Sequence, residues 1–347
     1  MSRKRFGVFK LILLCGIVAI ISAIPVVGSA INESDKDKPA NCECVITIWN
    51  VDTFESGSAS KTVFLESASL KFSKLNRGVY FLVKNLTVEE MENNFNGGFY
   101  PDMITFGYGI GEKIIEALED ISGLNVNSVR SEILNSGKKD GLLYAVGFLM
   151  GGMILATTEE KLMTAGLTSV SSVGNVVNIA GYDKELKKEK VHISSVIAGK
   201  NGYVNITKSY QKTTNGQQLS DCYLSENFYD AYADFVSYNK GTILLGTHRD
   251  LYKLSGRIAV GKINNVKIEY LSGYTNLIQY AGVVKGLSTE KKEVVCEFIE
   301  FLLTDNVQKL TTQIGMVNTI GNTYYESGEF MQLENALNDY LTVESLF

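Results

Sequence analysis

Residues 45–60 read VITIWNVDTFESGSAS, an apolar, β-branched run that is followed at once by small and acidic residues. The apolar run predicts a buried strand, because β-branched and aromatic side chains pack well on a pleated surface. Residues 61–76 then carry large apolar side chains three or four positions apart, which predicts a helix. A buried strand, a loop and an amphipathic helix in that order indicate the first part of an α/β fold.

The same alternation continues along most of the chain, and Thr87 with Glu90 forms a capping-box signature for one helix start. Further strands are predicted at 79–83, 102–106, around 191–197, 203–206 and 242–245, and as two strands within 142–157 around a turn at Gly151 and Gly152. Further helices are predicted after Thr87 and at 112–121, 226–237, 289–303 and 307–314. Because the loops that follow parallel strands meet at one edge of a sheet, the first candidate site comprises 52–60, 84–87 and 107–111.

The composition is that of a globular chain. Of the 347 residues, 45% are hydrophobic and 20% are charged, which provides a sizeable core and excludes a wholly disordered chain. Lysine and arginine number 33 against 38 aspartates and glutamates, a net charge of -5. A dedicated nucleic-acid binder carries a basic excess, so we expect no nucleic-acid partner.

The N-terminus has the layout of an export signal. Within residues 1–30, four basic residues and no acid precede an apolar run at 11–27 and three small residues at 28–30. An uncleaved membrane anchor is the alternative, since this run is close to the shortest membrane span. Leu14 before Cys15 disfavours lipid attachment, and residues 31–44 are predicted to be a polar tether.

The cysteines and histidines predict neither a disulfide framework nor a metal site. Four cysteines follow the export segment and allow three full pairings, among which the sequence does not choose: Cys42, Cys44, Cys222 and Cys296. No second cysteine pair follows at ligand spacing, and the chain has 2 histidines, so no metal is expected. The glycine-rich turn at 107–111 lacks the spacing of a nucleotide-binding loop, so no cofactor is expected either.

Three groups near strand ends are candidates for chemistry or binding. Asp52 and Glu55 are carboxylates that could act as acid and base on a sugar, or accept hydrogen bonds from ligand hydroxyls. Trp49, the only tryptophan, is either a core residue or a platform for a sugar ring. His248 and Arg249 follow a predicted strand directly, either as solvated groups of a surface loop or as polar groups in a cleft.

Five stretches taken in order resemble the extracellular solute-binding proteins of ATP-binding-cassette (ABC) importers, in the family 1-like group with sugar binders. They cover most of residues 45–317 and read ITIWNVDTFES, YPDMITFGYGIG, LLYAVGFLMGG, FVSYNKGTILLGTHRDLYKL and YTNLIQYAGVVKGLSTEKKEVVCEFIEFLLTDNVQKLTTQIGM. The export signal and the polar tether fit the same group. The single tryptophan and a short second lobe depart from many of its sugar binders.

The resemblance implies an α/β, two-lobe periplasmic-binding-protein-like fold (type II), in which each lobe is a mainly parallel sheet flanked by helices, with a hinge between the lobes. Lobe one would comprise 45–145 plus about 258–303, and lobe two 146–257 plus about 304–347. By position it also implies a set of ligand-binding residues: Trp49, Asp52, Thr53, Phe54, Glu55, Phe106, Gly107, Phe148, Met150, Gly246, Thr247, His248, Arg249, Tyr274 and Thr275, with Gly151 and Asn276 beside them.

The function that the resemblance implies is binding without catalysis. The protein would be exported, remain extracellular or at the cell surface, and be membrane-tethered if residues 1–30 are kept. It would act as a monomer, capture a small solute, a sugar or oligosaccharide, between its lobes, and deliver it to an ABC permease. Two alternatives stay open: a ligand sensor that presents a solute to a membrane receptor, and a secreted glycoside hydrolase that uses Asp52 and Glu55.

Overall fold

The computed structural model describes residues 39–164, 196–200, 202–216, 222–238, 240–339 and 341–347. The predicted export segment at 1–30 lies outside these residues, as does most of the predicted strand around 191–197. Contacts gather Ala40–Phe347 into one compact unit, and of the other unit, Met1–Pro39, only Pro39 is described. None of the described helices has the length and apolar character that crossing a bilayer requires.

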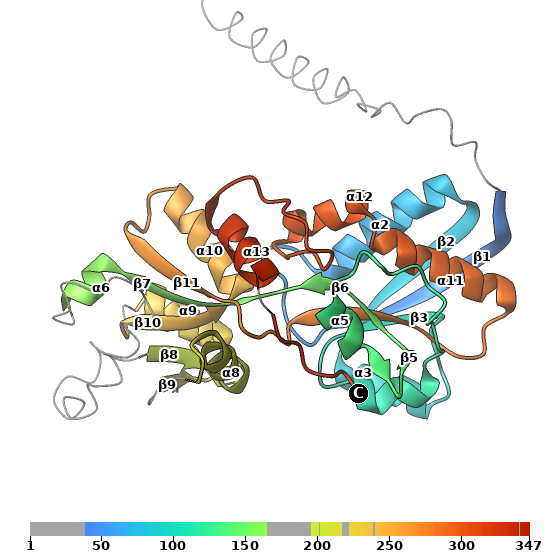
Figure 1. Ribbon diagram of the computed structural model, residues 1–347, viewed down its shortest axis with the longest axis horizontal. Coiled ribbons are helices and arrows are strands. Elements are labelled where there is room, and N and C mark those ends of the chain that lie inside the picture. Colours follow the sequence, from blue (N-terminus) through green and yellow to red (C-terminus); the bar gives the residue numbers. More distant parts are fainter. Residues whose placement is uncertain (1–38, 165–195, 201, 217–221, 239, 340) are drawn as a thin grey trace, which may run out of the picture. The chain divides into compact units, whose positions relative to one another are not determined.

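Among the described residues, five strands form a first sheet in the order β2-β1-β3-β12-β6 (Figure 1). Their bounds are β1 Pro39–Val51, β2 Arg77–Leu86, β3 Met103–Phe106, β6 Val146–Met150 and β12 Ile278–Val283. β3 runs parallel to β1, whereas β12 is antiparallel to both β3 and β6. β1 thus begins inside the segment predicted as a tether.

Helices cover both faces of the first sheet (Figure 1). α2 (Lys61–Leu75) and α11 (Thr289–Leu302) lie on one face, and α3 (Val88–Asn96) and α5 (Ser131–Ser136) on the other. Phe72 of α2 and Phe298 of α11 are buried and meet edge to face with ring centroids 5.4 Å apart. Burying each such side chain contributes about 1.5–3 kcal/mol, so the apolar stripes of the two helices hold them on the sheet.

A second sheet of five described strands has the order β11-β7-β10-β8-β9. Their bounds are β7 Met153–Thr158, β8 Val196–Gly199, β9 Cys222–Ser225, β10 Ile243–Thr247 and β11 Val266–Leu271. Its helices are α6 Glu159–Thr164, α8 Tyr203–Thr213, α9 Phe228–Val236, α10 His248–Ala259 and α13 Gly328–Asp339. Because a strand alternates its side chains between two faces, successive residues of β7 enter different apolar clusters. Ile154 packs in the cluster that includes residues of α10 and α13, and Leu155 packs in the cluster that includes residues of α8.

Both sheets are mixed, which corrects the expectation of mainly parallel sheets. β10 is parallel to β8 but antiparallel to β7, and β11 is antiparallel to β7. Strand direction follows from where the chain travels between strands, and an apolar run carries no mark of it. The two-sheet α/β architecture itself is confirmed.

The chain crosses between the sheets at other positions than predicted. It leaves the first sheet after Met150 and enters the second at Met153, so β6 belongs to the first sheet and not to lobe two. It returns between Leu271 and Ile278, so β11 belongs to the second sheet and not to lobe one. β6 and β7 are equally apolar, and the composition of the run at 142–157 therefore does not mark the boundary.

Most predicted elements are present, and three differ. The predicted helix at 307–314 is α12 (Asp305–Gln308) followed by a 3-10 helix at Lys309–Ile314. The predicted strand at 203–206 is the first turn of α8, whose buried residues Ile206, Ser209 and Tyr210 have helical spacing. β-branched residues at the start of this helix favour a strand locally, and tertiary packing overrides that preference. The predicted helix at 112–121 is shorter, with α4 at Gly111–Ile114 followed by a 3-10 turn at Ile115–Ala117.

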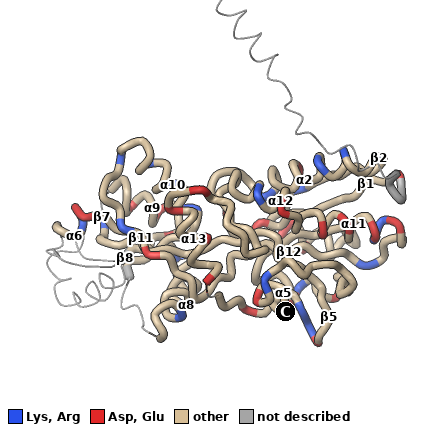
Figure 2. The backbone as a smooth tube through the Cα atoms, turned by 45° about the horizontal axis from the view of Figure 1, so that its top comes forward, with Lys and Arg blue, Asp and Glu red and all other residues tan. Residues whose placement is uncertain are grey.

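Charged side chains of both signs are interspersed along the described chain (Figure 2). Lys291 lies 3.0 Å from Asp102, and Lys292 lies 2.8 Å from Glu119. Such partly exposed pairs contribute about 0–1 kcal/mol each, so the apolar clusters account for most of the stability.

Candidate functional site

A cavity of about 820 Å³ is lined by residues from both sheets and their helices. This volume is typical of small-molecule sites, which span about 300–1,000 Å³. From the first-sheet side come all residues of 52–61 together with Tyr108, and from the segment between β11 and β12 come Asn276 and Leu277. From the second-sheet side come Met153, Gly202, Asn205, Ile206, Phe228, Tyr229, Thr247, His248, Arg249 and Lys253.

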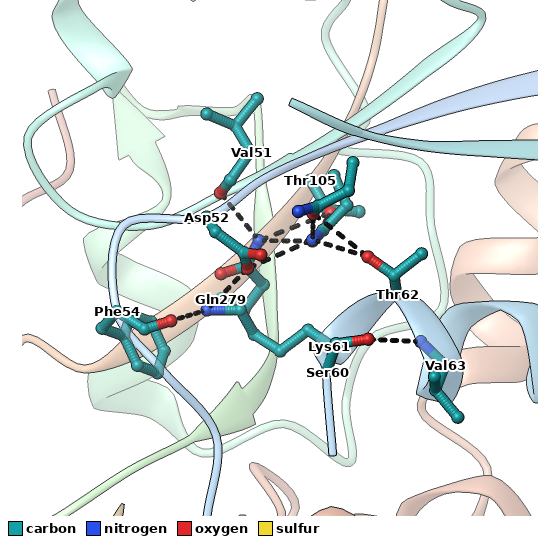
Figure 3. A network of polar contacts seen from close by, with 11 residues as sticks. Val51, Asp52, Phe54, Ser60, Lys61, Thr62, Val63, Thr105 and Gln279 are labelled. Atoms are coloured by element: carbon teal, nitrogen blue, oxygen red, sulfur yellow. Dashed lines mark hydrogen bonds and ion pairs between the residues drawn. The ribbon is translucent and has the colours of Figure 1, made fainter. Parts of the chain in front are cut away.

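Lys61 holds the loop after β1 in place (Figure 3). This side chain is 1% exposed, its Nζ lies 3.2 Å from Asp52 Oδ1, and it donates a hydrogen bond to the backbone carbonyl of Phe54. The same ammonium lies 3.7 Å from the centroid of the Phe54 ring. Burial lowers the pKa of Lys61 to about 8, and the charge of Asp52 opposes this shift. The contacts fix Asp52 and Phe54 at the cavity wall.

A buried amide network supports this wall from behind. Asn50 Nδ2 donates to Asn85 Oδ1 at 2.6 Å and to Asp52 Oδ1 at 3.2 Å. Asn50 Oδ1 accepts from Thr105 Oγ1 at 2.9 Å and from Gln279 Nε2 at 3.1 Å. The donors come from β3 and β12, and Figure 3 shows Thr105 and Gln279 beside Asp52. Four neighbouring strands, β2, β1, β3 and β12, therefore position the loop that carries the acidic residues.

Arg249 joins the two halves of the cavity. Its Nε lies 2.6 Å from Glu55 Oε2 in the loop after β1, and its Nη1 donates to Asp250 Oδ1 at 3.0 Å. The guanidinium lies 3.9 Å from the ring centroid of Tyr229, a cation–π distance. Only 5% of the Arg249 side chain is exposed. The three contacts hold its guanidinium in one orientation.

His248 and Asp250 are fully buried at the start of α10, where Thr247 and Asp250 form a capping box. Burial lowers the pKa of His248 to about 4 and raises the pKa of Asp250 to about 6. The imidazole is therefore neutral near pH 7. Gly151 leaves room for it, because a Cβ at position 151 would collide with the ring.

Aromatic side chains supply much of the remaining wall. Phe54, Tyr108, Phe228 and Tyr229 all line the cavity, and Tyr229 is 53% exposed. Aromatic faces of this kind pack against the C–H groups of a flat or ring-shaped ligand. The site thus combines apolar faces with fixed polar groups.

Seven of the ligand-binding residues implied by the resemblance line the cavity: Asp52, Thr53, Phe54, Glu55, Thr247, His248 and Arg249. The first four lie in the loop after β1. Thr247 ends β10, and His248 and Arg249 begin α10. Asn276 also lines the cavity. These segments are nearly 200 positions apart in the sequence, and the fold brings them together.

The other eight do not line the cavity: Trp49, Phe106, Gly107, Phe148, Met150, Gly246, Tyr274 and Thr275. Trp49 is buried against Phe95 with ring centroids 5.7 Å apart, which fits the interpretation as a core residue. Phe148 is also buried and stacks on Phe64 at 6.0 Å. Buried strand ends place side chains in the core as readily as in a site.

Several of these eight support the wall. Gly107 lies directly behind Thr53, where a Cβ would collide with the threonine hydroxyl. Thr275 Oγ1 donates to the carbonyl of Gly151 at 2.8 Å, next to His248. Tyr274 is turned away, and its hydroxyl donates to Glu344 Oε2 at 2.9 Å.

Sequence reasoning does not point to Lys61, Tyr229, Lys253 or the start of α8, all of which line the cavity. Lys61 is the first residue of an amphipathic helix, a position at which a lysine is normally exposed. Tyr229 has a usable signal, since it falls outside the buried face of α9 formed by Ala231, Tyr232 and Phe235. An aromatic residue opposite the buried face of a helix is a candidate for ligand contact.

In the described part of the chain, no cluster of three or more His, Cys, Asp or Glu side chains is arranged to hold a metal ion. Cys296 forms no disulfide, and burial raises the pKa of its thiol. The side chains of Cys42 and Cys222 lie outside the described residues.

Comparison with known proteins places the fold. No protein-family profile matches the chain, and no curated protein sequence matches it. Solved structures match it over nearly its whole length at low sequence identity. The GacH receptor of Streptomyces glaucescens, solved unliganded and with acarbose, is 15% identical, with a TM-score of 0.61 over 87% of this chain and 88% of that chain.

Two further sugar-binding structures are equally similar. MalE3 of T. maritima, solved with maltose, is 14% identical, with a TM-score of 0.62 over 87% of this chain and 89% of that one. The cyclic alpha-maltosyl-1,6-maltose binding protein of Arthrobacter globiformis is 13% identical, with a TM-score of 0.63 over 87% and 88%. The chain therefore has the two-lobe periplasmic-binding-protein-like fold of these structures.

Proposed function

We propose that this protein is an extracytoplasmic solute-binding protein, which captures a carbohydrate in the cavity and delivers it to an ABC permease. The observation that carries the proposal is the cavity itself. It has the volume of a small-ligand site, and it places aromatic faces beside fixed carboxylate, guanidinium and amide groups. Solved structures with the same fold include proteins bound to maltose and to acarbose.

The arrangement suits recognition of a polyhydroxyl compound. Tyr229 offers an apolar face, and Asp52 and Glu55 present carboxylate oxygens that accept hydrogen bonds from hydroxyls. Because the walls come from both sheets, a ligand that contacts both favours the arrangement in which they approach each other. A permease would recognise the protein in that arrangement. The export signal at 1–30 would direct the protein across the membrane to the side on which it meets the permease.

A hydrolase is the competing function, and the geometry supports it less well. Lys61 pairs with Asp52 at 3.2 Å, and Arg249 pairs with Glu55 at 2.6 Å. A general acid must donate a proton to the glycosidic oxygen. To carry that proton, Asp52 or Glu55 would first have to break its ion pair with Lys61 or Arg249. The ion pairs fit hydrogen-bond acceptors better than an acid and a base.

Calorimetric titration with Tyr229→Ala tests the proposal. A panel of neutral oligosaccharides of two to four rings is titrated into the purified protein, and one or more are expected to bind. Truncating Tyr229 should weaken binding about tenfold or more, because the stacking face is lost. Tyr238→Ala is the matched control, since Tyr238 is 69% exposed and does not line the cavity. Equal losses in both variants, or no binding to any sugar, would count against the proposal.

A further inference from the structure

Buried polar atoms without hydrogen-bond partners gather at the cavity. Nine such side-chain atoms occur among the described residues, and four of them belong to residues that line it. These four are His248 Nδ1, His248 Nε2, Arg249 Nη2 and Asn276 Oδ1. Backbone groups of Glu55 and Gly152 lie near His248. They raise its pKa and so partly offset the larger lowering caused by burial.

A polar group that is buried without a partner costs about 1–3 kcal/mol, so a concentration of such groups at one cavity calls for a ligand that supplies the partners. Asn276 is 8% exposed and His248 is 1% exposed, so bulk water reaches neither freely. Asn276 Oδ1 needs a donor, and Arg249 Nη2 needs an acceptor. A neutral imidazole needs one of each. Hydroxyl groups both donate and accept, and they satisfy all three residues at once.

The charges around the cavity balance. Its lining carries three cations, Lys61, Arg249 and Lys253, and two anions, Asp52 and Glu55. Asp250, buried behind the wall and bonded to Arg249, is the third anion. With His248 neutral, these three cations and three anions sum to zero, so a carboxylate on the ligand would give the cavity a net negative charge. A carboxylate on the ligand would compete with Glu55 for Arg249 and leave one negative charge unpaired.

We propose that His248, Arg249 and Asn276 form the subsite that reads the hydroxyl groups of an uncharged sugar, and that this subsite selects neutral over acidic sugars. The proposal rests on the proposed carbohydrate-binding function and deepens it. It assigns specificity to buried groups, of which the His248 ring packs against Gly151 and the Arg249 guanidinium is held by Glu55 and Asp250. The aromatic wall then contributes affinity with little discrimination among sugars.

Titration of three proteins with two kinds of sugar tests this subsite. The proteins are the unmodified chain, Asn276→Ala and Ser255→Ala, and the sugars are neutral oligosaccharides and trigalacturonate. Ser255 is the matched control, because its hydroxyl is also buried and unpartnered but does not line the cavity. Asn276→Ala should bind the neutral sugar about tenfold more weakly, Ser255→Ala should bind it unchanged, and trigalacturonate should bind at least about tenfold more weakly than the neutral sugar.

A second variant guards against simple misfolding. Gly151→Ala displaces the His248 ring and should weaken neutral-sugar binding, whereas Gly123→Ala, where a Cβ meets nothing within 4 Å, should not. Neutral-sugar binding that survives both Asn276→Ala and Gly151→Ala overturns the subsite while the carbohydrate function stands. Preferred binding of trigalacturonate overturns the selectivity alone. Absence of binding to every sugar overturns the carbohydrate function and this inference with it.

Discussion

At the scale of single residues, Lys61 has the clearest thermodynamic signature. The folded state lowers its pKa from 10.5 to about 8, mainly through burial. Between these two values the unfolded chain binds more protons than the folded chain, so the free energy of unfolding rises with pH. Below pH 8 the buried charge destabilises the fold by about 3 kcal/mol, because both states are then protonated. Asp52 and the Phe54 carbonyl limit that cost by holding the ammonium.

We therefore predict that Lys61→Met weakens this pH dependence. In the unmodified protein, the free energy of unfolding measured by denaturant titration should rise between pH 8 and 10.5, and in Lys61→Met this rise should be smaller. Lys71→Met, at an exposed position of the same helix, serves as the control. Parallel profiles for all three proteins would show that Lys61 is not buried as a charged group.

At the scale of elements, the start of α10 holds two buried groups with opposite pH dependence. The pKa of His248 is lowered from 6.5 to about 4, so it makes the free energy of unfolding rise with pH across that window. The pKa of Asp250 is raised from 3.8 to about 6, so it makes the free energy fall with pH from 3.8 to 6. In the unmodified protein the two effects largely cancel between pH 4 and 6.

Asp250→Asn should reveal the histidine alone. In the unmodified protein the backbone N–H of Thr247 donates a hydrogen bond to Asp250 Oδ2 at 3.0 Å. The asparagine side chain keeps an oxygen that can accept this bond, but it does not titrate. The free energy of unfolding of this variant should rise more steeply between pH 4 and 6 than that of the unmodified protein. Asp230→Asn changes an exposed acid at the start of α9 and should leave the profile unchanged. A profile of Asp250→Asn with the unmodified slope would contradict the assignment.

Elements with a strong period were predictable from the sequence. The helices at Lys61–Leu75 and Thr289–Leu302 match their predictions within one residue, because their apolar side chains recur at helical spacing and a serine caps each N-terminus. The start of α8 was not predictable in this way. Val204, Ile206 and Thr207 are β-branched, and only packing against the second sheet reveals that the segment is helical.

At the scale of the whole compact unit, part of the site follows from fold logic. The loop after β1 ends a buried strand, and Thr247 to Arg249 end another, so both were candidates from the sequence. Lys61, Tyr229 and the start of α8 were not, because they become neighbours only when the fold brings elements of both sheets to one cavity. Local patterns specify which side of an element is buried, but not which distant element it meets.

The central claim is that this cavity retains a carbohydrate and leaves it chemically unchanged. Native mass spectrometry of the purified protein, incubated with neutral oligosaccharides of two to four rings, tests it in one measurement. The account predicts a complex whose mass exceeds that of the protein by one intact oligosaccharide. A complex that carries only a shortened sugar would indicate hydrolysis, and absence of any sugar complex would indicate another class of ligand; either result would contradict the account.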